Sequence, residues 1–157
     1  KYNFCIGVAA YPEGHIEADS LDKDMGYLKQ KVDSGAEFII TNYAYDNRFF
    51  FDFVARARRA GIDLPILPGI MPIYTEKMTK FLAKLCGATI TPEIKKGLAG
   101  IAEDDKSAVL QFGIDYAYQQ CKGLLDAGVP GVHMYTMDRS KSVVEIISRL
   151  RDEGYTL

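Results

Sequence analysis

The chain has 157 residues, which is enough for one domain with a hydrophobic core. Its formal charge of −2, with 25% charged and 48% hydrophobic residues, describes an ordinary globular protein and argues against a nucleic-acid binder. No apolar run approaches the roughly 20 residues that a membrane-spanning helix needs, so we expect no membrane association.

Three strand–helix units occupy the first part of the chain. Apolar runs predict strands over residues 4–10, 38–43 and 65–70, and the first run is continuous enough for a strand buried on both faces. After each strand, apolar residues recur at helical spacing, which predicts a helix that buries one stripe. The candidate N-terminal caps of these three helices are Asp19 or Ser20, Asp46 or Asn47, and Thr75.

The alternation changes after the third helix. Residues 91–93, Thr-Pro-Glu, predict the start of a short helix, since threonine can cap and proline is tolerated in the first turn. A longer helix is predicted over 105–127, then a strand over 131–137 and a last helix that is capped by Ser140 or Ser142. Two extra helices therefore precede the fourth strand.

This order of elements requires an α/β fold with a parallel sheet. Two architectures fit. One is a small doubly wound sheet, and the other is a set of parallel βα units that forms about half of a TIM (βα)8 barrel. The half-barrel leaves open sheet edges and needs partner strands. In both cases we expect residues 1–157 to form a single domain, which is a partial one if the barrel is correct.

The cysteines are few and widely separated. Cys5, Cys86 and Cys121 have no partner at metal-ligand spacing, so we expect no metal site. We expect three buried, reduced thiols, which favours a reducing compartment such as the cytoplasm.

Polar side chains follow the predicted strands, and the carboxyl ends of parallel strands share one face, where ligands bind. His15 follows the first strand, Asn42 ends the second and Arg139 follows the fourth. The Asn42 amide can donate and accept at once, which suits the edge of a heterocycle such as a pterin. Arg139 suits a carboxylate. These residue types are also common in turns and at surfaces, so the pattern indicates a ligand face but not which ligand.

Two further features have a functional and a structural interpretation. Asp24, Tyr27 and Lys31 share one face of the first helix, either as a solvated face or as a cradle for a nucleotide phosphate and sugar. In the third strand, Pro68 blocks a ladder donor and Gly69 permits close backbone approach. That pair indicates either a ligand contact or a structural bulge.

Five segments together resemble methylenetetrahydrofolate reductase. They are residues 9–18 with Ala-Ala-Tyr-Pro-Glu-Gly-His followed by Glu17-Ala18, 29–36 with Lys-Gln-Lys-Val-Asp-Ser-Gly-Ala, 38–41, 68–72 with Pro-Gly-Ile-Met-Pro, and 133–139 with His-Met-Tyr-Thr-Met-Asp-Arg. The resemblance runs in order through essentially the whole chain. It implies the C-terminal half of the family's catalytic TIM barrel.

The resemblance also implies a reaction in which NADH or NADPH reduces FAD, and the reduced flavin converts 5,10-methylenetetrahydrofolate to 5-methyltetrahydrofolate. The positions that correspond to the family's FAD contacts are Tyr11, His15, Asp24, Tyr27, Gln30 and Lys31. Those that correspond to its folate contacts are Asn42, Met78, Leu82 and Arg139. Asn42 stands where the family typically has glutamine.

The family's catalytic glutamate and its Arg-Gly-Asp loop belong to the N-terminal half of the barrel, so the resemblance assigns no catalytic residue here. We therefore expect the 157 residues alone to be inactive and to need the N-terminal half or a partner chain. The family often forms oligomers, which implies a homo-oligomer. Two other functions remain open: a non-catalytic half-barrel that binds flavin or serves assembly, and a small doubly wound binding domain.

Overall fold

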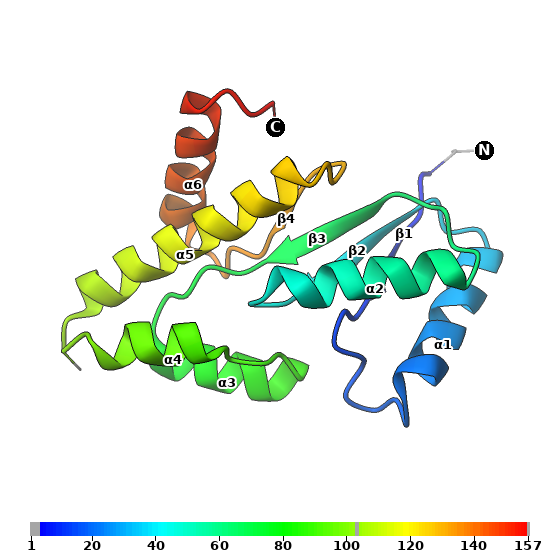
Figure 1. The fold of residues 1–157 in the computed structure, drawn as a ribbon, viewed down its shortest axis with the longest axis horizontal. Helices are drawn as coiled ribbons and strands as arrows, with labels where there is room; N and C mark the ends of the chain where they lie inside the picture. Colours follow the sequence, from blue (N-terminus) through cyan, green and yellow to red (C-terminus); the bar gives the residue numbers. More distant parts are fainter. Residues whose placement is uncertain (1–3, 103, 157) are drawn as a thin grey trace.

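A computed structural model describes residues 4–102 and 104–156 (Figure 1). The elements, in chain order, are β1 (Gly7–Ala10), α1 (Leu21–Asp33), β2 (Phe38–Tyr43), α2 (Asn47–Arg59), β3 (Ile66–Ile70), α3 (Glu76–Cys86), α4 (Pro92–Ala99), α5 (Lys106–Asp126), β4 (His133–Met134) and α6 (Ser140–Asp152). Each element that the sequence predicts is present, in the predicted order.

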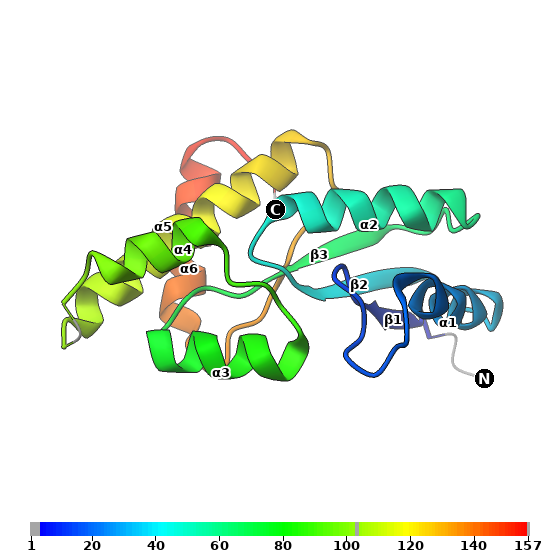
Figure 2. The same cartoon turned by 60° about the horizontal axis from the view of Figure 1, so that its bottom comes forward.

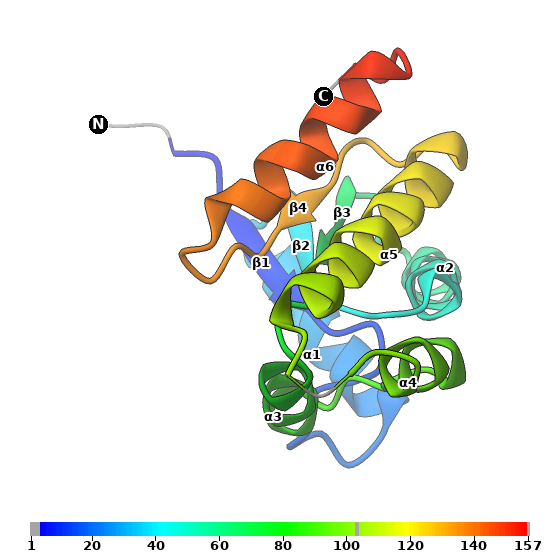
Figure 3. The same ribbon diagram turned by 90° about the vertical axis from the view of Figure 1, so that its left-hand side faces the viewer.

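The four strands form one parallel sheet in the order β1-β2-β3-β4. A doubly wound sheet reverses its strand order at a switch point, and this sheet has no reversal. Because crossovers between parallel strands are right-handed, strands that always advance in one direction place their helices on the same side. Figure 3 shows α2 and α5 on the same side of the strands. The arrangement is that of half a barrel, and it confirms that interpretation over the doubly wound sheet.

The two faces of the sheet differ in burial. The face toward the helices, called here the covered face, carries Ile39, Ile66 and Ile70, which lie in one core with side chains from α1, α2, α5 and α6. The opposite face, called here the open face, carries Phe38 and Ile40 from β2, which remain partly exposed. Alternate residues of a strand point to opposite faces, so β2 alternates strictly between partly exposed and buried residues.

A second, smaller core lies at the carboxyl end of the sheet, where α3 and α4 pack together. Figure 2 shows both helices beyond the carboxyl end of β3. Their apolar sides enclose Tyr43, which ends β2, Tyr45, which follows it, and Met71, which follows β3. The extra helices that the sequence predicts therefore close the end of the sheet where its polar strand endings gather.

Most helix starts agree with the sequence. Five residues accept a hydrogen bond from a backbone N–H of the first turn, as N-caps do; they are Ser20, Asp46, Thr75, Thr91 and Asp105. The predicted cap of the last helix is wrong, because α6 begins at Ser140 after Arg139 and has no side-chain cap. Ser142 is instead buried in the helix–sheet core.

Two strand predictions are also wrong in extent or burial. Strand β1 is not buried on both faces, since Phe4 is 76% exposed and Ile6 is 52% exposed. The reason is its position at the sheet edge, where one side has no neighbouring strand. The fourth strand has two residues and not seven, because Met137 and Asp138 turn the chain with φ angles of 47° and 59°.

The prediction of three buried thiols is wrong as well. Cys121 is buried between α5 and the sheet, whereas Cys86 is half-buried and Cys5 is exposed. Cys5 precedes the edge strand β1, so the open sheet edge explains its exposure as it explains that of Phe4.

Candidate functional site

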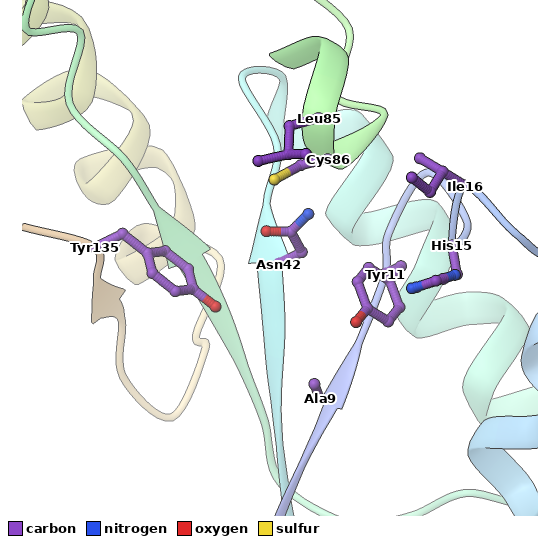
Figure 4. Close-up of a pocket in the computed structure, with 8 residues that line it drawn as sticks. All are labelled: Ala9, Tyr11, His15, Ile16, Asn42, Leu85, Cys86 and Tyr135. Carbon is purple, nitrogen blue, oxygen red and sulfur yellow. The ribbon is translucent and has the colours of Figure 1, made fainter. Parts of the chain in front are cut away.

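A cavity of about 280 Å³ lies at the carboxyl ends of the strands. Figure 4 shows side chains from the β1 end, the following loop, β2, the end of α3 and the segment after β4 converging on it. Its lining residues are Ala9, Tyr11, His15, Ile16, Asn42, Leu85, Cys86 and Tyr135. The cavity therefore forms where parallel βα folds usually bind ligands.

The loop after β1 holds two ring side chains in a fixed arrangement. Gly14 has a φ of 91°, and its N–H donates to the Tyr11 carbonyl at 3.0 Å, which closes a tight turn. The turn brings the rings of Tyr11 and His15 edge to face at 4.5 Å. The His15 Nδ1 accepts the Glu17 N–H at 3.2 Å, so the proton of a neutral imidazole sits on Nε2.

Helix α1 adds two charged groups beside this loop. Asp24 Oδ2 accepts the His15 backbone N–H at 3.3 Å, and the Lys31 ammonium donates to the Ala9 carbonyl at 3.0 Å. Both contacts tie the helix to the end of β1. Tyr27 and Gln30 are exposed on the same helix. Of the six positions matched to FAD contacts, Tyr11, His15, Asp24 and Lys31 are thus brought to one rim.

The close approach of β2 and β3 explains Gly69. A side chain at Gly69 would place its Cβ 2.2 Å from the Thr41 carbonyl oxygen and 2.7 Å from the Tyr135 ring. The Gly69 N–H donates instead to Thr41 Oγ1 at 3.0 Å, and the Tyr135 hydroxyl donates to the Thr41 carbonyl at 3.2 Å. The register shifts between Ile40 and Tyr43. Of the two interpretations of Gly69, a ligand contact or a structural bulge, the structure supports the structural bulge.

Of the four positions matched to folate contacts, Asn42 lines the cavity. Leu82 is 9% exposed and lies in the second core, with Met78 packed against it. The Arg139 guanidinium lies 5.5 Å from the Tyr74 ring centre, and the Tyr74 hydroxyl donates to the Tyr135 carbonyl at 3.3 Å. Arg139 therefore reaches the cavity wall only through these two tyrosines.

The tyrosines around the cavity are neutral hydrogen-bond donors at physiological pH. Burial raises the pKa of Tyr135 and of Tyr74, although the Arg139 charge opposes the effect at Tyr74. Burial also raises the pKa of Tyr45 to about 12 and that of Tyr43 well above its usual range. Their hydroxyls can bind a ligand without competing ionisation.

The structure adds lining residues that the sequence did not single out as a site. Tyr135 belongs to a strand ending that carries polar residues, so position alone could have indicated it. Ile16, Leu85 and Cys86 have no such signal, because they reach the cavity through the packing of α3 against the loop after β1. The Glu13 carboxylate supports that packing by accepting the Thr89 N–H at 3.1 Å.

Two searches of the described residues concern metal and membrane association. Across residues 4–102 and 104–156, no three His, Cys, Asp or Glu side chains are placed to share a metal ion. Within the same ranges, no helix combines the length and apolar character needed to cross a bilayer.

The fold and the cavity define the class of protein: part of a βα barrel with a cavity at the carboxyl ends of its strands. The protein-family model for methylenetetrahydrofolate reductase matches residues 1–151, so the chain belongs to that family.

Curated relatives agree with this family. Methylenetetrahydrofolate reductase 1 of Schizosaccharomyces pombe is 41% identical over 147 residues, and the match covers 94% of this chain and 24% of the relative. The 5,10-methylenetetrahydrofolate reductase of Escherichia coli is 37% identical over 139 residues, covering 88% of this chain and 47% of the relative. The chain thus spans about a quarter to a half of the length of these relatives.

A solved structure supports the fold. An uncharacterized protein from Clostridium thermocellum, described as binding two copies of 5-methyl-5,6,7,8-tetrahydrofolic acid, superposes with a TM-score of 0.64 at 18% identity. The match covers 95% of this chain and 53% of that protein. At this identity it bears on architecture alone, and it agrees with a chain that forms about half of a barrel.

Proposed function

We propose that the chain forms the C-terminal half of a barrel that reduces 5,10-methylenetetrahydrofolate to 5-methyltetrahydrofolate with FAD and NADH or NADPH. One observation carries this proposal: the groups matched to FAD contacts gather at the end of β1, directly beside a cavity that holds Asn42. The family match supports the reaction, and the geometry is consistent with neighbouring sites for flavin and folate.

The residues at the rim fit FAD by their chemistry. Lys31 uses one donor on the Ala9 carbonyl and keeps others for a phosphate, while Asp24 can accept from ribose hydroxyls. Tyr11 and His15 offer ring faces and edges beside the same strand end. Tyr27 and Gln30 complete the set as exposed residues of α1. Bound FAD would supply hydride transfer from the nicotinamide to the folate.

On the folate side, Asn42 would pair with the pterin edge and Arg139 with a carboxylate of the substrate. Met78 and Leu82 are also proposed as folate contacts. They lie in the second core, so their contact with folate requires α3 to shift. The catalytic acid would come from the N-terminal half of the barrel. We accordingly propose that the 157 residues alone are inactive, and that the working protein is a cytoplasmic homo-oligomer.

The test uses the intact protein. We expect a yellow flavoprotein whose colour is bleached by NADH or NADPH and restored by 5,10-methylenetetrahydrofolate. The control is residues 1–157 alone, which should show neither bleaching nor turnover. A flavin that NADH or NADPH bleaches but that methylenetetrahydrofolate does not reoxidise would remove the folate assignment and keep the flavin one.

A second candidate is a non-catalytic half-barrel that binds flavin or serves assembly. The observation in its favour is the open face of the sheet, where Phe38 and Ile40 stay partly exposed and can pack on a partner chain. Flavin binding without bleaching by either nicotinamide would favour this function over the reductase.

A further inference from the structure

One buried polar atom near the cavity has no partner. Tyr43 is 2% exposed, and its hydroxyl is the only buried side-chain oxygen or nitrogen of the described residues that forms no hydrogen bond. Buried polar groups are nearly always paired, because leaving one unpaired costs stability. This hydroxyl therefore needs an explanation, because every other buried side-chain oxygen or nitrogen in residues 4–102 and 104–156 has a hydrogen-bond partner.

The hydroxyls of other tyrosines nearby form hydrogen bonds with backbone carbonyls. Tyr74 donates to the Tyr135 carbonyl, Tyr116 donates to the Tyr45 carbonyl at 2.7 Å, and Tyr135 donates to the Thr41 carbonyl. Each hydroxyl joins two segments of the fold. Phenylalanine would fill the space of the Tyr43 ring equally well, so the hydroxyl has no structural role in this state.

The Tyr43 ring lies beside the cavity wall, since its centre is 6.3 Å from the ring centre of Tyr135, which lines the cavity. Besides burial, the neighbours that raise the pKa of Tyr43 include Tyr45 and Cys86, and the Cys86 thiol acts in part as a weak hydrogen-bonding contact. Figure 4 shows the Cys86 sulfur pointing from the end of α3 toward the Asn42 side chain. The thiol is a weak hydrogen-bonding group and does not satisfy the hydroxyl.

We propose that Tyr43 is a ligand-binding residue whose hydroxyl donates to an acceptor atom of a planar heterocycle held in the cavity beside Asn42. Cys86 is the last residue of α3, before Gly87 in the left-handed region, and this binding requires its side chain to rotate away from the hydroxyl. The acceptor is a ring carbonyl or ring nitrogen. Its identity as a pterin rests on the proposed function.

Tyr43→Phe tests this proposal in the intact protein, with 5-methyltetrahydrofolate as the probe. We expect the ligand-free variant to melt no lower than the parent, and about 2–4 °C higher if the unpaired hydroxyl destabilises it. We expect affinity for 5-methyltetrahydrofolate to fall about 5- to 10-fold, with unchanged FAD content. A merely structural role would lower the melting temperature and leave the affinity alone.

Tyr118→Phe is the matched control, because its hydroxyl pairs with Glu153 on the outer surface. Its affinity for 5-methyltetrahydrofolate should equal that of the parent protein. A Tyr43→Phe variant that melts lower, or that binds the probe as well as the parent, overturns the proposal. Failure of the parent itself to bind the probe overturns the proposed function and the pterin assignment together, so the two failures are distinguishable.

Discussion

The two faces of the sheet are made from the same strands but differ in how deeply their side chains are buried. On the covered face, Ile39 and Ile70 are 0% and 1% exposed beneath helices that the chain itself supplies. On the open face, Ile40 follows Ile39 directly and stays partly exposed. The chain therefore completes the core on the covered face with its own helices, but leaves apolar side chains of the open face partly exposed. The cavity lies at the carboxyl end of the open face, which the other half of a barrel would cover.

The largest expected effect is the difference in free energy of unfolding between variants of Ile39 and Ile40, which lie on opposite faces of β2. Ile39→Ala should lower the free energy of unfolding by about 2–5 kcal/mol, because it leaves a cavity in a closed core. Ile40→Ala should cost less than about 1 kcal/mol in residues 1–157 alone, since the side chain is partly exposed there. Urea denaturation of both variants measures the difference. Equal costs would mean that the two faces are equally closed.

Helix α5 also has no room for added atoms where it packs on the segment after β3. A Cβ at Gly113 of α5 would lie 1.9 Å from the Ile73 carbonyl oxygen, so Gly113→Ala should destabilise by about 1–3 kcal/mol or more. Gly26 of α1 has no atom within 4 Å of such a Cβ. As the matched control, Gly26→Ala should stabilise by about 0.5–1 kcal/mol through its helix propensity. A tolerated Gly113→Ala would contradict the tight packing of α5 on the segment after β3.

Lys31 of α1 lies at the rim, beside the end of β1. Lys31→Ala should weaken FAD binding by about 1–3 kcal/mol, because it removes a charge-assisted contact to phosphate. Lys29→Ala is the control, as Lys29 pairs with Asp33 on the same helix. Fluorescence of released flavin on dilution of the intact protein measures both. Equal flavin loss from the two variants would refute the cradle on α1.

Asn42→Gln probes the open side of the same rim. If the cavity holds a pterin, restoring the longer amide of the family should tighten folate binding by about 1 kcal/mol, the net contribution of one hydrogen bond. Titration of the intact protein with 5-methyltetrahydrofolate measures the change. Weaker binding would show a pocket shaped around Asn42 for another ligand.

The smallest expected effect concerns Asp46, which caps α2 after β2. Its carboxylate accepts the Arg48 N–H at 2.9 Å, and hydrogen bonding to Arg48 lowers the pKa of Asp46. A lowered folded-state pKa adds stability above the unfolded value of roughly 3.9, and this is lost as the pH falls through the folded pKa. Asp46→Asn keeps a cap and should cost about 0.3–1 kcal/mol at neutral pH. The cost should vanish in acid, and a cost that persists there would contradict the charge effect.

Local patterns in the sequence were sufficient for most of the fold. Helix spacing, the caps Ser20, Thr75 and Thr91, and four apolar runs depend on neighbouring residues, so they could be predicted without coordinates. The candidate site was predictable in part for the same reason. Residues at the ends of parallel strands share one face, which placed Tyr11, His15 and Asn42 correctly at the cavity.

The sequence by itself thus determined the elements, their order and the end of the sheet where the cavity lies, because each depends on contacts a few residues apart. Only the tertiary structure decided which apolar runs are covered, since the exposure of Phe4 and Cys5 follows from an absent neighbouring strand and not from their own chemistry. It also decided that Cys86 and Tyr135 meet at the cavity, and that the Tyr43 hydroxyl stays unpaired behind it. These outcomes depend on packing between segments distant in the chain, which no local pattern encodes.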